Sequence, residues 1–161
     1  MAFQLHPKLQ ADTHLISSTA QCQILLMDDA RYPWIILVPQ VTEVRELYEL
    51  DEQQQQHVYR TILRVSKGLA QYTNAEKMNV AALGNQVPQL HIHIIARFER
   101  DAAWPAPVWG VGNAEPYTPQ QLEEGKKWSR RYKTSINCAN PKGFSQKQYC
   151  KRQKRGGKYK S

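Results

Sequence analysis

The chain has 161 residues, of which 41% are hydrophobic and 22% are charged, so it holds enough apolar material for one domain with a single core. This composition excludes a wholly disordered chain, a collagen-like fibre and a membrane-spanning protein. The formal net charge of +8 by itself suggests a nucleic-acid binder. However, residues 126–161 hold thirteen of the 22 Lys and Arg residues and none of the 14 acidic ones, so residues 1–125 are acidic.

Two short apolar runs predict a first β-hairpin. Cys22–Met27 and Trp34–Val38 have the composition of strands, and the segment Asp28–Pro33 between them contains turn-forming residues and a proline. A connection this short joins antiparallel strands. We therefore expect the two runs to pair with each other.

A periodic apolar stripe predicts the main helix after Asp51. Asp51 and Gln54 form a capping pair at its start, and Thr73-Asn74 marks its end. A shorter helix is expected just before it, at Glu43–Tyr48. The stripe recurs at spacings of three and four residues and consists of Val58, Ile62, Val65, Leu69 and Tyr72.

A second hairpin is predicted at Met78–Leu83 and Leu90–Ala96, joined by a loop at Gly84–Pro88. Short links between strands favour antiparallel pairing over parallel crossovers. The order of hairpin, helix and hairpin therefore indicates an α+β fold.

The sequence after the second hairpin is less regular. Residues 104–110 are rich in Trp and Pro, and no regular element is expected there. Thr118 followed by Pro119 predicts a helix start, with Thr118 as N-cap. Gly125 interrupts that helix after about one turn, and the basic segment follows.

The segment Gln89–Ile95 carries the chemistry. Because side chains alternate along a strand, His91 and His93 share one face with Gln89, about 7 Å apart, and the apolar residues between them face the helix. Three interpretations are open. The two histidines are accidental on a half-exposed strand, or they bind a metal for which ligands are missing, or they catalyse attack on phosphorus.

The stretch Gly84–Ile95, followed by Arg97, resembles the signature of the histidine triad (HIT) superfamily. That signature alternates three histidines with apolar residues after a Gly-containing loop that often ends in Val-Pro. The resemblance covers roughly residues 1–110. It implies an antiparallel sheet of about five strands with one main packing helix, a homodimer, and nucleotidyl transfer or hydrolysis at a nucleotide α-phosphate.

The resemblance also implies roles for individual residues. His91 matches the nucleophile, which forms a covalent nucleotidyl-histidine, and His93 matches the histidine that contacts the α-phosphate. Gln89, as a polar orienter, completes the expected catalytic set. The expected substrate-binding residues are Asn79, Asn85, Gln86, Arg97 and Trp104. The loop residues among these have an equally good alternative role as turn residues that bond their own backbone.

Two departures from the HIT pattern bear on function. Gln89 replaces the first histidine of the triad, and glutamine forms hydrogen bonds but cannot titrate. Tyr32-Pro33-Trp34 stands where typical members have a Gly-His pair. The alternative function is therefore a nucleotide-binding module with weak or no catalysis. Neither interpretation calls for a metal or another cofactor.

Cysteine usage and the start of the chain suggest the compartment. Cys22, Cys138 and Cys150 stand at unpatterned spacings, so we expect no disulfide framework and a reducing cytoplasm. No basic segment followed by an apolar one begins the sequence, so no signal peptide is expected.

Residues 126–161 form a basic tail that is distinct from the HIT-like domain of residues 1–125. Lys and Arg alternate there with aromatic residues, a pattern that binds RNA or DNA through phosphates and stacking. The same pattern is typical of a disordered, solvated extension. A frameshift near the end of the coding sequence is a third explanation, because the helix that begins at Pro119 loses its apolar period at Gly125.

Overall fold

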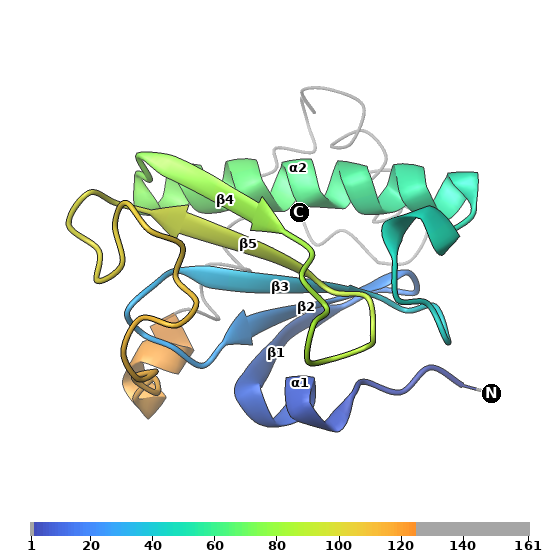
Figure 1. The fold of residues 1–161 in the computed structure, drawn as a ribbon, viewed down its shortest axis with the longest axis horizontal. Helices are drawn as coiled ribbons and strands as arrows, with labels where there is room; N and C mark the ends of the chain where they lie inside the picture. The colour runs from blue at the N-terminus through green and yellow to red at the C-terminus, as the bar shows by residue number, and fades with distance from the viewer. Residues whose placement is uncertain (1, 125–161) are drawn as a thin grey trace, which may run out of the picture. The chain divides into compact units, whose positions relative to one another are not determined.

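The computed structural model describes residues 2–124, which form one five-stranded antiparallel sheet flanked by helices (Figure 1). The strand order is β1-β2-β3-β5-β4, so β1 and β4 are the edge strands. The elements are α1 (Pro7–Asp12), β1 (Thr13–Ser18), β2 (Cys22–Met27), β3 (Trp34–Pro39), a 3₁₀ turn η1 (Leu47–Glu49), α2 (Glu52–Thr73), β4 (Lys77–Ala81) and β5 (Ile92–Arg97). The α+β class and the five strands are as predicted.

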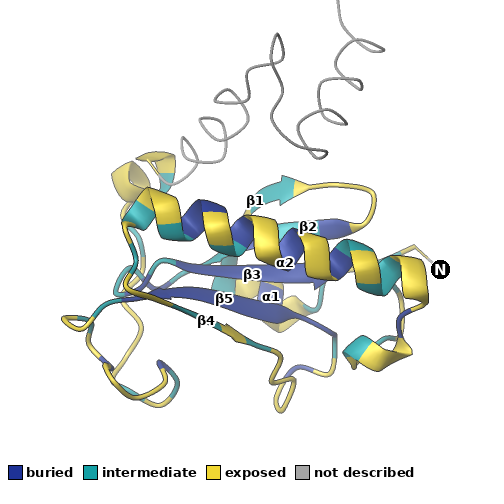
Figure 2. Cartoon of the chain, turned by 90° about the horizontal axis from the view of Figure 1, so that it is seen from above, coloured by how far each residue is buried: buried dark blue, intermediate teal, exposed yellow. Residues whose placement is uncertain are grey.

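The predicted hairpins are both present. β2 pairs antiparallel with β3, with Ile24 opposite Leu37, and β4 pairs antiparallel with β5, with Val80 opposite Ile94. β3 and β5 lie side by side at the centre of the sheet, and all of their residues are buried (Figure 2).

Helix α2 covers one face of the sheet. Asp51 caps it as predicted: its carboxylate accepts from the backbone N–H of Gln54, whose side chain accepts from the N–H of Asp51. The helix ends at Asn74, which adopts a left-handed conformation. Figure 2 shows buried and exposed residues alternating along α2. The buried ones are Val58, Thr61, Ile62, Val65, Gly68 and Leu69.

A second apolar cluster covers the opposite face of the sheet. Trp34 and Ile95 are cross-strand neighbours in it, and Leu9 of α1 packs onto the same cluster. Val108 from the Trp- and Pro-rich segment joins them. The sheet is therefore enclosed between α2 on one face and α1 with residues 103–111 on the other.

Several boundaries differ from the predictions. The expected helix at Glu43–Tyr48 is only the turn η1, because Glu43 has φ of 58° and cannot begin a helix there. β5 begins at Ile92 and β4 ends at Ala81, so the loop between them is longer than expected. α1 and β1 were not predicted at all.

The second helix start is confirmed. Thr118 accepts a hydrogen bond from the N–H of Gln121 through its hydroxyl, and its own N–H donates to the Gln121 side chain. Helix follows at residues 119–124. The expectations for the tail, residues 126–161, lie outside the described residues. Within the described part of the chain, no helix is long and apolar enough to cross a membrane.

Candidate active site

His91 and His93 lie together on the face of the sheet that carries α1. His93 is in β5, opposite Ile36 of β3 on one side and Ala81 of β4 on the other, and His91 immediately precedes the strand. The two imidazole rings lie edge to face with their centroids 4.9 Å apart, which is closer than strand spacing alone predicts. Both side chains are buried.

The backbone of Gln89 holds the imidazole of His91. Nδ1 of His91 lies 2.7 Å from the carbonyl oxygen of Gln89. Because a carbonyl oxygen can only accept, Nδ1 carries the proton, and the lone pair of the neutral ring is on Nε2. A neutral imidazole with an available Nε2 lone pair is a nucleophile.

Trp34 holds the imidazole of His93 in the opposite tautomer. The indole N–H donates to Nδ1 of His93 at 3.0 Å, so the proton of the neutral ring is on Nε2. Burial, and to a smaller extent the neighbouring His91, lowers the pKa of His93 to about 4. His93 is therefore a neutral hydrogen-bond donor near neutral pH.

Both histidines line a cavity of about 350 Å³. Its walls come from α1, the β4–β5 loop and the two central strands, with Trp109 beside His93 at 5.1 Å between ring centroids. Apolar groups predominate, and the polar groups are few. The lining residues are Lys8, Leu9, Asp12, Thr13, Met27, Trp34, Ile36, Leu83, Gly84, Asn85, Gln86, Val87, His91, His93 and Trp109.

The β4–β5 loop, which carries two of the expected substrate-binding residues, reaches this cavity. Asn85 and Gln86 are exposed and line it. Gly84 before them has φ of 68°, a backbone conformation that favours glycine. The turn at Gly84 thus delivers two amide side chains to the mouth of the histidine cavity.

The structure does not bring Asn79, Arg97 and Trp104 into this cavity. Arg97 is fully buried, and its guanidinium forms a two-point ion pair with Asp101 at 2.7 and 3.0 Å. It also donates to the Asn79 side chain and to the carbonyl of Ala106, both at 2.8 Å, and lies over the Trp104 ring. These residues fix the 101–106 segment.

The side chain of Gln89 also points elsewhere. Its amide bonds the backbone of Gln4 and His6, and Gln89 does not line the cavity. The orienting contact to His91 comes from the Gln89 backbone carbonyl, which any residue would supply.

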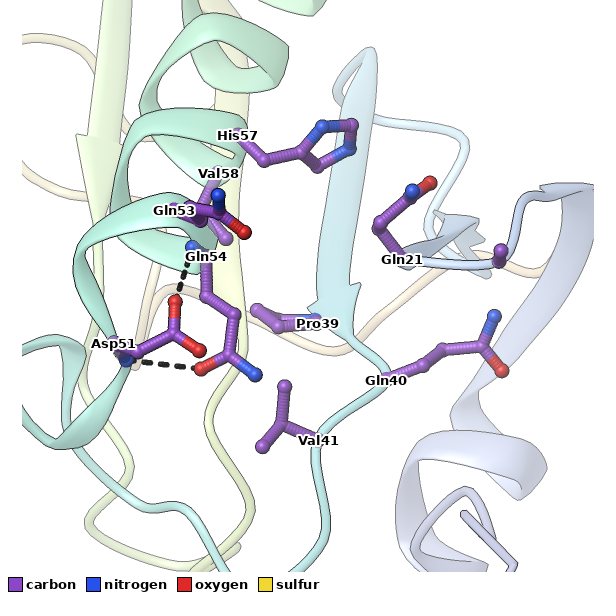
Figure 3. A pocket seen from close by; sticks show the side chains of 10 residues that line it. Gln21, Pro39, Gln40, Val41, Asp51, Gln53, Gln54, His57 and Val58 are labelled. Atoms are coloured by element: carbon purple, nitrogen blue, oxygen red, sulfur yellow. Dashed lines mark hydrogen bonds between the residues drawn. The ribbon is translucent and has the colours of Figure 1, made fainter.

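A second cavity, of about 430 Å³, lies at the start of α2 (Figure 3), and neither His91 nor His93 is among its described lining residues. Amide side chains dominate its walls, and Asp51 and Gln54 are engaged in the helix cap. His57 lines it as well. Among the described residues, no group of three or more His, Cys, Asp or Glu is placed to hold a metal ion.

Comparison with known proteins identifies the family. The model of the HIT domain matches residues 8–100, the part of the chain that carries both histidines and the loop before them. The chain belongs to the HIT family. Members of this family are generally nucleotide hydrolases or transferases. None of the curated proteins matches the chain.

Solved HIT structures share the fold closely. A histidine triad protein from Bradyrhizobium japonicum is 44% identical, with a TM-score of 0.79 and coverage of 81% of this chain and 98% of that one. One from Marinobacter aquaeolei VT8 is 46% identical, with a TM-score of 0.79 and coverage of 81% and 96%. The Plasmodium falciparum diadenosine triphosphate hydrolase, in complex with Cyclomarin A, is 15% identical, with a TM-score of 0.57 and coverage of 82% and 80%, and shares the fold alone.

Several residues of this HIT cavity were not predicted as site residues. Among them are Trp34 and Trp109, which both contact His93. Lys8 is another, and it lies in α1, where no helix was expected. Pro7 at the first helical position was the available signal for α1.

Proposed function

We propose that this HIT protein is a nucleotide hydrolase or transferase that acts at an α-phosphate through a covalent nucleotidyl-His91 intermediate. The observation that carries the proposal is the complementary pair of tautomers. The Gln89 carbonyl leaves a lone pair on Nε2 of His91, and the Trp34 indole leaves a proton on Nε2 of His93. One cavity therefore holds a nucleophile and a neutral donor side by side.

In the first step, Nε2 of His91 forms a bond to the α-phosphorus. The bond from phosphorus to the leaving-group oxygen breaks, and the leaving group keeps the electron pair. A phosphate-containing leaving group is a stable anion near neutral pH, so it needs no proton. An amine leaving group takes a proton from solvent as its bond to phosphorus breaks. The positive charge that develops on the imidazole is stabilised by the hydrogen bond from Nδ1 to the Gln89 carbonyl.

His93 supports the charge on the phosphoryl group in the same step. Its Nε2–H donates to a non-bridging oxygen, and burial strengthens this hydrogen bond. Asn85 and Gln86 at the mouth of the cavity bind further phosphate oxygens through their amide groups. Asn79, Arg97 and Trp104 are left out of this binding set because they lie outside the cavity.

The second step releases the nucleotide. A water oxygen bonds to phosphorus, the bond from phosphorus to Nε2 of His91 breaks, and the imidazole regains its lone pair. The proton of the water leaves to solvent. With an alcohol or amine in place of water, the same step is a transfer reaction.

Intact-protein mass spectrometry after rapid denaturation at alkaline pH tests the proposal, because acid hydrolyses the phosphorus–nitrogen bond of a nucleotidyl-histidine. The full chain is incubated with an adenosine phosphoramidate or a dinucleoside polyphosphate. We expect an added mass of one nucleotidyl group in the wild type and none in His91→Ala. His57→Ala, which removes a histidine from the other cavity, is the control and forms the adduct.

Nucleotide binding measured by calorimetry without an adduct or product contradicts the catalytic proposal. That outcome favours the alternative, a nucleotide-binding module. An adduct that persists in His91→Ala also contradicts it, because another residue is then the nucleophile.

A further inference from the structure

The side chain of Gln89 fastens the N-terminal segment to the strand that carries the histidines. Its Oε1 accepts from the backbone N–H of His6 at 2.9 Å, and its Nε2 donates to the carbonyl of Gln4 at 2.9 Å. These bonds join residues more than 80 positions apart. Bonding to a backbone N–H and a backbone carbonyl in this way needs a side chain with a donor next to an acceptor. The amide group of glutamine has both.

His6 transmits this attachment to α1. It is the N-cap residue of the helix, and its Nδ1 accepts from the backbone N–H of Lys8 at 3.1 Å. Leu9 in the first turn is buried in the core cluster. Gln89, His6 and Leu9 together therefore set the position of Lys8.

Among the described residues 2–124, Lys8 is the only Lys or Arg that lines the histidine cavity. Its ammonium group forms an ion pair with Asp12 at 2.7 Å, and both side chains are partly exposed. An exposed ion pair of this kind is weak, so the ammonium group can leave Asp12 and bind a more highly charged anion instead. His93 is neutral and supplies no positive charge to the cavity. The ammonium group of Lys8 is therefore the positive charge that a polyphosphate in this cavity would meet.

We infer that Lys8 binds the phosphate beyond the scissile bond, and that Gln89 is a positioning residue that holds the helix of Lys8 in place. The substrate class is then a nucleotide with an anionic, phosphate-containing leaving group. This inference rests on the proposed function. It also gives the Gln89 side chain a use, which is to position α1 through its bonds to the N-terminal segment.

Steady-state kinetics with two substrates of one nucleoside tests the role of Lys8. One is a dinucleoside tetraphosphate, and the other is a phosphoramidate whose leaving group is an amine. We expect Lys8→Gln to lower kcat/KM for the tetraphosphate about tenfold more than for the phosphoramidate, and more steeply at low salt. Lys67→Gln removes an exposed lysine on α2 as the matched control.

The role of Gln89 is tested by coupling it to Lys8. Gln89→Ala keeps the backbone carbonyl but removes both bonds to the N-terminal segment, and we expect a selective rise in KM for the tetraphosphate. In Lys8→Gln/Gln89→Ala the two losses do not add. If Gln89→Ala does not fold, His6→Ala replaces it in this experiment. That variant removes the side-chain bond to the Lys8 N–H and leaves Gln89 unchanged.

The outcomes separate this inference from the proposed function. Absence of a His91-dependent adduct in the wild type overturns the proposed function, whatever the variants do. If the adduct forms but Lys8→Gln affects both substrates equally, or neither, the assignment of Lys8 is wrong. Additive losses in the double variant overturn the positioning role of Gln89.

Discussion

The indole N–H of Trp34 donates to Nδ1 of His93 at 3.0 Å, and the Trp34 ring lies tilted over the imidazole with centroids 5.5 Å apart. Trp34 is a donor that neither titrates nor accepts, so it fixes one tautomer of His93 at every pH at which His93 is neutral. This bond thus makes His93 a dedicated Nε2–H donor.

The first prediction concerns this bond. Trp34→Phe keeps an aromatic ring beside His93 but removes the donor, so both tautomers of His93 become populated. We expect kcat/KM to fall roughly tenfold, the cost of about one hydrogen bond. Nitrogen-15 NMR of the imidazole measures the tautomer ratio. Trp109→Phe removes the other indole N–H near His93 and should leave that ratio unchanged, and equal ratios in both variants contradict the prediction.

The second prediction concerns stability and pH. Burial, followed by the effect of His91, lowers the pKa of His93 to about 4 from an ordinary value near 6.5. Between these two pH values the unfolded chain binds a proton at His93 and the folded chain does not. The free energy of unfolding therefore decreases as the pH falls from about 6.5 to 4. The expected loss from this group is about 3 kcal/mol. Urea unfolding at several pH values measures it, and His93→Gln should show a shallower decline. Equal slopes contradict this.

The sequence predicts those parts of the fold that depend on residues close together in the chain, and misses those that depend on distant residues. The cap of α2 at Asp51 and the hairpin of β2 and β3 follow from residues within a few positions, and both are confirmed. α1 was missed because a six-residue helix carries little periodicity. Its position is fixed by Gln89 from the far end of the domain.

In the candidate site, too, the local features could be predicted from the sequence and the long-range contacts could not. His91, just before β5, and His93 within it lie on one face, as alternation of side chains predicts, because that property is local. Their tautomers depend on one backbone carbonyl and on an indole 59 positions away, which no local pattern contains. Arg97 follows the motif in sequence but lies further along β5, beyond the cavity, where Asp101 binds it.

The third prediction concerns the Arg97–Asp101 pair. Burial alone would raise the pKa of the Asp101 carboxyl, but hydrogen bonds from Arg97 and from the N–H groups of Phe98 and Ala103 lower it to about 2. Arg97→Met leaves this anion buried without its partner, so we expect a loss of about 3–5 kcal/mol in the free energy of unfolding. Denaturant unfolding measures the loss.

Arg100→Met is the matched control for this prediction. Arg100 is exposed and lies only over the Phe98 ring, at 5.3 Å from its centroid. Its replacement should cost less than about 1 kcal/mol. Similar losses in the two variants would show that the buried ion pair is not what holds the 101–106 segment.

The fourth prediction concerns assembly. β4 is an edge strand with Val80 48% exposed, and Leu63 on the neighbouring α2 is 69% exposed. Exposed apolar side chains on and near an open strand edge are suited to contact with a second copy of the chain, so we expect a homodimer. Leu63→Glu changes both copies in a twofold dimer and should raise the dissociation constant about a hundredfold. Sedimentation velocity measures it, with Leu15→Glu on the other edge strand as the control. A monomeric wild type, or equal effects of the two variants, would refute this interface.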